Sequence, residues 1–146
     1  MDVDEFFKRL IDKLENSLKK TKNEKIISRT FNGNICNELI PGGCEHRRES
    51  DEPFTALAVQ VKNKKSLEES LQSYIQGEML DGDNQYMCDK CNKKYDTLKR
   101  TSIKTLPNYL IVVLKRFEFD YQTMSRSKVN DYCSFPNSLN MMPYTT

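Results

Sequence analysis

The segment QYMCDKCNKKY, residues 85–95, indicates how the surrounding chain folds. Tyr86 and Tyr95 lie in strand-like sequence on either side of Cys88 and Cys91. A turn that holds two cysteines between two strands is typical of a zinc knuckle, because both thiolates then point toward one ion. A redox Cys-x-x-Cys motif usually opens a helix, and residues 92–95 show no helical pattern. We therefore favour a metal site over a redox pair or an incidental spacing.

The knuckle supplies two ligands, whereas a structural zinc ion takes four. Cys44 and His46 are the expected partners, because residues two apart in extended chain point to the same side. The sequence therefore predicts one Cys3His zinc site made of Cys44, His46, Cys88 and Cys91. Cys36 is an alternative fourth ligand. Four protein ligands leave no position for a reactive water, so the predicted role of this ion is structural.

Length and composition narrow the class of protein. The 146 residues fit one domain. The five cysteines are an odd number, which argues against a fully paired disulfide framework. The net charge of +2 is too small to indicate binding to nucleic acid or to a membrane surface. We find no secretory signal and no membrane-spanning run, and we expect an intracellular protein, cytoplasmic or nuclear.

Hydrophobic periodicity predicts a mixed α+β chain. Residues 4–20 are expected to form an amphipathic helix whose apolar stripe, Phe7, Leu10, Leu14 and Leu18, packs on a core. Ser66 and Glu69 form a capping box that opens a second helix, which ends near Gly77. The side chains expected to face inward are Leu67, Leu71 and Tyr74 or Ile75. The remaining expectations are a loop or short hairpin at 30–50, a turn at 80–84, and strands at 54–61, 85–87, 93–103 and 109–119.

Several motifs, in this order, resemble the ubiquitin-specific protease family (peptidase family C19). They are Asp2-Val3-Asp4-Glu5-Phe6, Phe31-Asn32-Gly33, Cys44-Glu45-His46, Ser66-Leu67-Glu68, Cys88-x-x-Cys91, Leu114-Lys115-Arg116-Phe117, Lys128-Val129-Asn130-Asp131 and Phe135-Pro136. They cover nearly the whole chain. The Cys-x-His pair and the reading of residues 78–88 are similar to the large fat-facets-type members.

The resemblance implies the fold: an N-terminal thumb helix, zinc-stapled antiparallel β fingers and a partial palm sheet of a papain-like domain. It places the end of the thumb at 1–29, the fingers with one structural zinc ion at 30–105, and part of the palm at 106–146. In this family the parent domain hydrolyses the isopeptide bond after the C-terminal glycine of ubiquitin. The partners implied are ubiquitin and ubiquitinated proteins.

The resemblance also implies that no catalytic residue lies in this chain. The family's nucleophilic cysteine is expected upstream of residue 1, and its general-base histidine downstream of residue 146. Cys36 and Cys133 have no free histidine to deprotonate them, as a thiol nucleophile requires. We therefore expect a segment of a longer enzyme that is inactive by itself.

The resemblance also implies that Asp2, Glu5, Phe117 and Lys128 bind the C-terminal tail of ubiquitin. Acidic groups suit the arginines of that tail. Each residue also has an ordinary explanation. Asp2 and Glu5 suit a helix N-terminus, Phe117 could pack on the palm, and Lys128 could be a solvated turn residue.

Two other functions remain open from the sequence. The first is a stand-alone zinc-ribbon module that binds protein or nucleic acid. Its basic face would comprise Lys62, Lys64, Lys65, Lys93, Lys94, Lys99 and Arg100. These charges are interleaved with acids and lack a series of stacking aromatics. The second is a segment of a pseudo-enzyme that binds ubiquitin without cleaving it.

Overall fold

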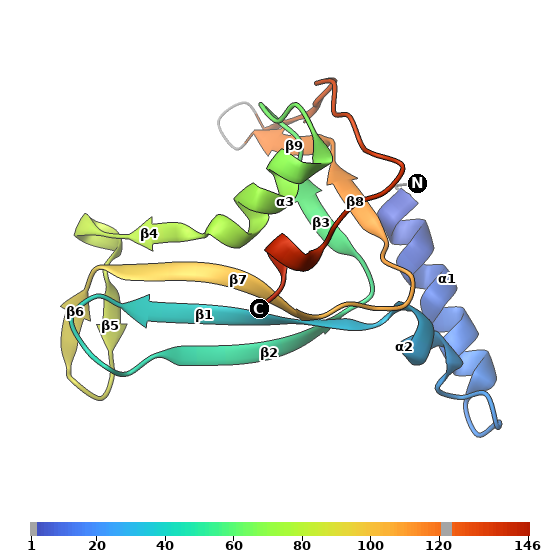
Figure 1. The fold of residues 1–146 in the computed structure, drawn as a ribbon, viewed down its shortest axis with the longest axis horizontal. Coiled ribbons are helices and arrows are strands. Elements are labelled where there is room, and N and C mark those ends of the chain that lie inside the picture. The colour runs from blue at the N-terminus through green and yellow to red at the C-terminus, as the bar shows by residue number, and fades with distance from the viewer. Residues whose placement is uncertain (1–2, 121–123) are drawn as a thin grey trace.

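The computed structural model describes residues 3–120 and 124–146 (Figure 1). The helices are α1 (Val3–Leu18), α2 (Ile26–Phe31) and α3 (Leu67–Gln76), with short 3-10 turns at Gly82–Asn84 and Met142–Tyr144. The strands are β1 (Gly33–Pro41), β2 (Arg48–Phe54), β3 (Leu57–Gln60), β4 (Glu78–Leu80), β5 (Tyr86–Cys88), β6 (Lys93–Tyr95), β7 (Thr97–Thr105), β8 (Val112–Lys115), β9 (Phe117–Asp120) and β10 (Ser125–Lys128). The fold is α+β, as expected from the sequence.

A four-stranded sheet in the order β2-β1-β7-β4 forms the long axis of the molecule (Figure 1). All its pairs are antiparallel, and Ile35 of β1 lies opposite both Glu52 of β2 and Ile103 of β7. The β1–β2 turn and the β5–β6 hairpin lie together at one end. The sheet therefore carries its two hairpin tips away from the rest of the chain.

The main core lies between the sheet and α3. Leu57, Val59, Leu71 and Ile103 are at most 1% exposed there. Ser66 begins α3, because its hydroxyl accepts a hydrogen bond from the Glu69 backbone amide and satisfies a free donor of the first turn. The capping box and the inward face of this helix are thus as the sequence predicts.

A second unit combines β3 with β8 in parallel and continues into the β9–β10 hairpin. The predicted strand over 109–119 is wrong in its continuity, since it divides into β8 and β9 around Arg116. The Arg116 side chain donates to the backbone oxygens of Val129 and Asp131, and the Arg116 oxygen accepts from the Val129 amide. These bonds turn the backbone away from the hydrogen-bonded pair of β3 and β8.

Helix α1 forms where the sequence predicts it, but its apolar stripe is only partly covered. Phe7 and Leu18 are half-buried, and Ile11 beside them is buried. Leu10 and Leu14 are each 41% exposed. The expectation that the stripe packs on a core of the chain is therefore wrong at Leu10 and Leu14.

The sequence prediction for residues 30–50, a loop or short hairpin, is right about the hairpin but wrong about its length. Residues 30–31 end helix α2, and β1 and β2 form a long hairpin from Gly33 to Phe54. Gly33, Pro41, Gly42 and Gly43 suggest broken structure, but they lie at the ends of β1 or just after it. The predicted strand over 93–103 also divides, at Asp96, whose backbone oxygen accepts from the Gly42 amide.

Among residues 3–120 and 124–146, no helix has both the length and the apolar character that a membrane crossing requires.

Candidate metal centre

The β5–β6 hairpin presents the first two sulfur atoms. Tyr86 lies opposite Tyr95, and Cys88 lies opposite Lys93, so the turn between the strands holds Cys91. The turn closes through a 2.8 Å bond from the Asn92 amide to the Cys88 oxygen. Asn92 adopts a positive φ of 52°, a conformation that asparagine tolerates better than most residues. This geometry is the knuckle that the sequence predicts.

The β1–β2 turn presents the other two ligand groups. Cys44 and His46 lie in the irregular segment between β1 and β2, rather than in the extended strand that the sequence argument assumed. The Arg47 amide donates to the Glu45 oxygen at 3.0 Å. This local bond curls the turn so that both side chains still reach the knuckle.

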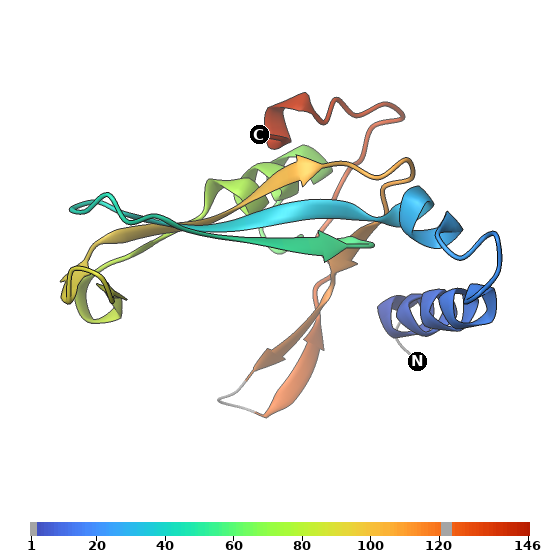
Figure 2. The same cartoon turned by 90° about the horizontal axis from the view of Figure 1, so that it is seen from below.

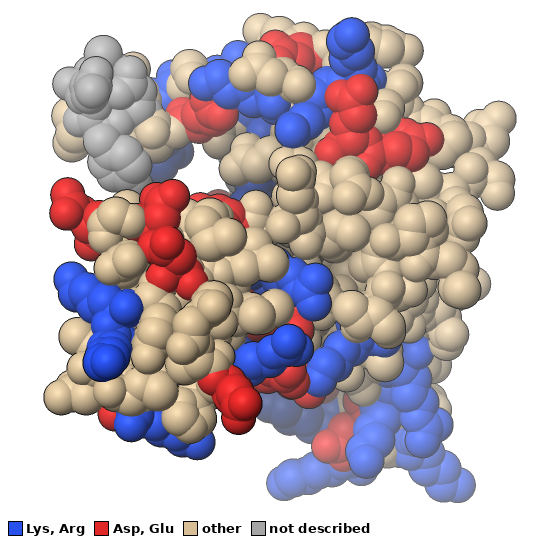
Figure 3. Space-filling view, turned by 60° about the vertical axis from the view of Figure 1, so that its left-hand side comes forward, with Lys and Arg blue, Asp and Glu red and all other residues tan. Residues whose placement is uncertain are grey.

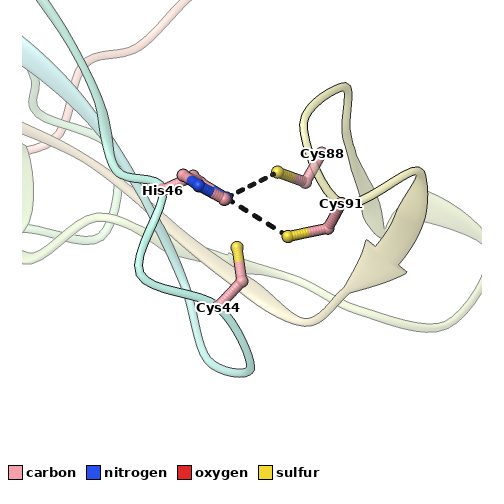
Figure 4. Close-up of side chains that lie close together, drawn as sticks. All are labelled: Cys44, His46, Cys88 and Cys91. Carbon is pink, nitrogen blue, oxygen red and sulfur yellow. Dashed lines mark hydrogen bonds between the residues drawn. The ribbon is translucent and has the colours of Figure 1, made fainter.

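The four side chains converge, as Figure 4 shows. The ligand atoms of Cys44, His46, Cys88 and Cys91 all lie within 4.8 Å of one another. The Nδ1 atom of His46 is 3.2 Å from the Cys91 sulfur and 3.8 Å from the Cys88 sulfur. These residues form a cluster that could hold a metal ion and that joins the two tips.

The protonation of the thiols follows from their surroundings. The pKa of Cys88 is lowered to about 7, mainly because the backbone amides of Cys91 and Lys90 donate to its sulfur and outweigh the effect of burial. The pKa of Cys44 is raised, mainly by burial, and the nearby Cys88 and Cys91 sulfurs add to this effect. Cys88 is therefore the thiol prepared to act as a metal-binding thiolate near neutral pH.

The donor set fits zinc. Three thiolates and one imidazole are the ligands of a closed Cys3His site, and the ligand atoms of a tetrahedral zinc ion lie about 3.3–3.8 Å apart. Of the two distances from His46 Nδ1, 3.8 Å lies at the end of that range and 3.2 Å lies just below it. Cys36 does not join the cluster. It is buried in β1 opposite Asp51, so the alternative fourth ligand is wrong.

Comparisons with known proteins agree with the fold. The family model described as "Ubiquitin carboxyl-terminal hydrolase" matches residues 1–146. The chain belongs to the ubiquitin carboxyl-terminal hydrolase family. It is 44% identical over 144 residues to human ubiquitin carboxyl-terminal hydrolase 9Y, and 42% identical to the probable hydrolase FAF of Drosophila melanogaster. Both matches include 99% of the present chain, but only 6% and 5% of the length of these two relatives.

Solved structures of this hydrolase family extend the comparison. A chain of the SAGA Ubp8/Sgf11/Sus1/Sgf73 DUB module bound to ubiquitin aldehyde matches with a TM-score of 0.86 and 31% identity. A chain of a variant of this module bound to monoubiquitin matches with a TM-score of 0.87 and the same identity. The matches cover all of the present chain and 33% and 34% of the chains compared. At this identity the likeness concerns the family domain as well as the fold.

The four residues assigned to the ubiquitin tail are only partly brought together. Phe117 and Lys128 are direct cross-strand neighbours in the β9–β10 hairpin, and both are exposed. Glu5 bonds to Arg9 on the exposed side of α1 at 2.6 Å. Asp2 lies outside the described residues.

A groove of about 470 Å³ between α1 and β8 has Phe117 at its wall. Its wall on the α1 side includes Val3, Asp4 and Phe7, whereas Glu5 is not among its lining residues. Asp4 is absent from the predicted site residues, because the family motif points to Asp2 and Glu5 on either side of it. The helical spacing could have identified it, since Asp4 and Phe7 are one turn apart.

The basic face suggested for a zinc-ribbon module is divided among ion pairs. Lys62, Lys99 and Arg100 bond to Glu118, Glu78 and Glu38, respectively. Figure 3 shows blue basic and red acidic side chains mixed on the face of the molecule that it displays. A denser basic group lies at its lowest part, where the α1–α2 connection is found in Figure 1. The seven residues do not form a continuous basic surface for nucleic acid.

Proposed function

We propose that this chain forms the ubiquitin-holding fingers and part of the palm of a deubiquitinating thiol protease. Residues 1–29 would end the thumb, 30–105 would form the fingers, and 106–146 would belong to the palm. One zinc ion would be held by Cys44, His46, Cys88 and Cys91. The observation that carries the proposal is this four-residue cluster, which joins two hairpin tips in a chain similar to chains of ubiquitin-bound modules.

The open face of the sheet supports a role in holding a globular partner. In Figure 2, α3 and the C-terminal end lie on one side of the sheet, while α1 and the β9–β10 hairpin project from the other. Ile40, Leu98 and Met79 are neighbours across β1, β7 and β4, and strand alternation directs them to the side opposite Ile35 and Ile103. Met79 is 57% exposed. These side chains offer apolar contact area near the tips.

The groove beside Phe117 supports a role in guiding an extended segment. Val3, Phe7 and Phe117 provide its apolar walls, and Asp4 adds a carboxylate. A carboxylate in such a groove can form charge-assisted hydrogen bonds with an arginine of a bound tail. Asp4 already accepts from Lys8 at 2.7 Å in the free chain. We propose that a bound arginine displaces this exposed ion pair, which contributes little by itself.

The proposal assigns this chain a positioning role and no part in bond cleavage. In the parent enzyme a thiolate would attack the carbonyl of the ubiquitin C-terminal glycine, and a histidine would transfer the proton. His46, the one histidine of the sequence, lies in the metal cluster. Cys36 and Cys133 are buried. We propose that both catalytic groups lie outside residues 1–146 and that this chain alone does not hydrolyse ubiquitin conjugates.

An NMR titration of isotope-labelled ubiquitin with the zinc-loaded chain tests the proposal. We expect shifts on the ubiquitin body and on its C-terminal tail. Phe117→Ala should remove mainly the tail shifts, because it opens the wall of the groove. Phe135→Ala is the matched control, since Phe135 is 75% exposed and does not line the groove. Absence of shifts with the zinc-loaded chain, or equal effects of both substitutions, would contradict the proposal.

A further inference from the structure

Tyr95 connects the two hairpin tips without the metal. It is the last residue of β6, and its half-buried ring reaches across to Gly43 in the β1–β2 turn. A Cβ atom placed on Gly43 would lie 2.6 and 2.7 Å from two carbon atoms of that ring. The ring therefore fills the space of a side chain at residue 43. A glycine is required there for close approach rather than for backbone freedom.

A backbone bond beside Tyr95 supports the same link. The Gly42 amide donates to the Asp96 oxygen at 2.8 Å, and Pro41 pairs with Thr97 in the sheet. The β1–β2 turn is thus attached to the end of β6 at consecutive residues, 95 and 96. Cys44 and His46 follow this attachment point directly.

We propose that Tyr95 is a positioning residue of the metal centre. Its ring holds the β1–β2 turn against the knuckle, so that the four ligands are gathered before the ion binds. Gathering the ligands in advance lowers the entropy cost of binding and raises affinity. The inference rests on the proposed function in one respect, that the ion is zinc.

The test compares Tyr95→Ala with Tyr95→Phe and Tyr86→Ala. Tyr95→Phe keeps the ring. Tyr86 lies directly opposite Tyr95 in the same hairpin, so Tyr86→Ala gives a matched loss of one ring. Zinc affinity is measured by competition with a chromogenic chelator, and the thiolate-to-metal charge-transfer band is recorded after loading with cobalt(II). We expect Tyr95→Ala to weaken zinc binding roughly 10-fold or more and to shift the band, while Tyr95→Phe and Tyr86→Ala change neither.

A double-mutant cycle tests the contact of the ring with Gly43. Gly43→Ala should weaken zinc binding in the wild-type background, because the new Cβ displaces the ring. It should have little effect in the Tyr95→Ala background, where that space is empty. Gly43 has no positive φ, so alanine introduces no backbone strain there.

Three results would overturn the inference. The first is equal affinities and spectra for wild type, Tyr95→Ala and Tyr86→Ala. The second is an effect of Gly43→Ala that is the same in both backgrounds. The third is a wild-type chain that takes up no zinc, and that result alone would also overturn the proposed metal site.

Discussion

The two ends of the central sheet are held together by different means. At the α3 end, Leu57, Val59, Leu71 and Ile103 exclude water almost completely, and burial of apolar surface stabilises the packing. At the tip end, the buried side chain of the β5–β6 hairpin is Cys88, a member of the cluster that could hold a metal ion. On our proposal, the order of the tips depends on that ion and on Tyr95. The sheet would then combine a base that apolar packing supports with an end that needs a bound ion.

The largest effect is expected from removal of the knuckle. The double variant Cys88→Ser/Cys91→Ser should reduce zinc from one ion per chain to none, because the two remaining ligands cannot hold it. Structural zinc contributes about 10–16 kcal/mol of apparent binding free energy in zinc-finger peptides, so the tips should lose their order. Elemental analysis measures the metal content.

Cys36→Ser is the control for the knuckle variant. It should leave zinc stoichiometry unchanged, because Cys36 lies outside the cluster. Loss of zinc in Cys36→Ser, or retained zinc in the double variant, would contradict the ligand assignment.

The base should respond to an apolar truncation instead. Leu71→Ala removes a fully buried side chain of α3 and should lower the free energy of unfolding by about 2–5 kcal/mol. Chemical denaturation followed by circular dichroism measures the change.

Leu14→Ala provides the comparison for Leu71→Ala, because Leu14 is 41% exposed on α1. Its effect should stay within about 0.5 kcal/mol. Equal costs at the two leucines would mean that α1 packs as tightly as α3, against the description of its partly covered stripe.

A smaller effect is expected at the start of α3. Ser66→Ala removes the hydroxyl that accepts from the Glu69 amide, and should cost about 0.5–2 kcal/mol. Ser73→Ala, within the same helix, should be neutral or slightly stabilising, because alanine favours helix interiors. Thermal denaturation of both variants makes the comparison, and an unchanged Ser66→Ala protein would show that the cap contributes nothing.

The smallest effect concerns pH. Asp51 has a lowered pKa, first because Lys104 donates to it and then because Cys36 does. Its contribution to stability is therefore present above the unfolded pKa, near 3.8, and is lost as pH falls through the lower folded pKa. Asp51→Asn should make the melting temperature depend less on pH in acid, whereas exposed Asp83→Asn should not. Identical acid profiles for wild type and Asp51→Asn would remove this ion pair from the account.

What could be predicted from the sequence differs between the same two ends. The knuckle, the α3 cap and the inward face of α3 are local signals: two cysteines in a turn, a Ser-x-x-Glu box and a 3.6-residue period. Each depends on residues close in sequence, so each was predicted correctly. The cluster of Cys44 and His46 with the knuckle was also predicted, although the extended conformation assumed for these two residues is not the one observed.

The errors arise where distant contacts decide the structure. β1 contains Asn34 and Asn37 and is flanked by glycine and proline, so its own residues favour a loop. It is a strand because β2 and β7 pair with it on both sides. The division of 109–119 depends on Arg116 reaching the oxygens of Val129 and Asp131, more than ten residues away. Tyr95 went unnoticed because only the folded chain brings it over Gly43.

Hydrogen exchange of the chain with and without a zinc chelator tests most directly whether the two ends are held by different means. We predict that removal of zinc abolishes protection of the amides in β5 and β6, residues 86–95. Protection at Leu71 and Ile103 should stay at its zinc-loaded level, because apolar packing holds the base. Unchanged protection at the tips, or loss of protection at both ends together, would contradict the account.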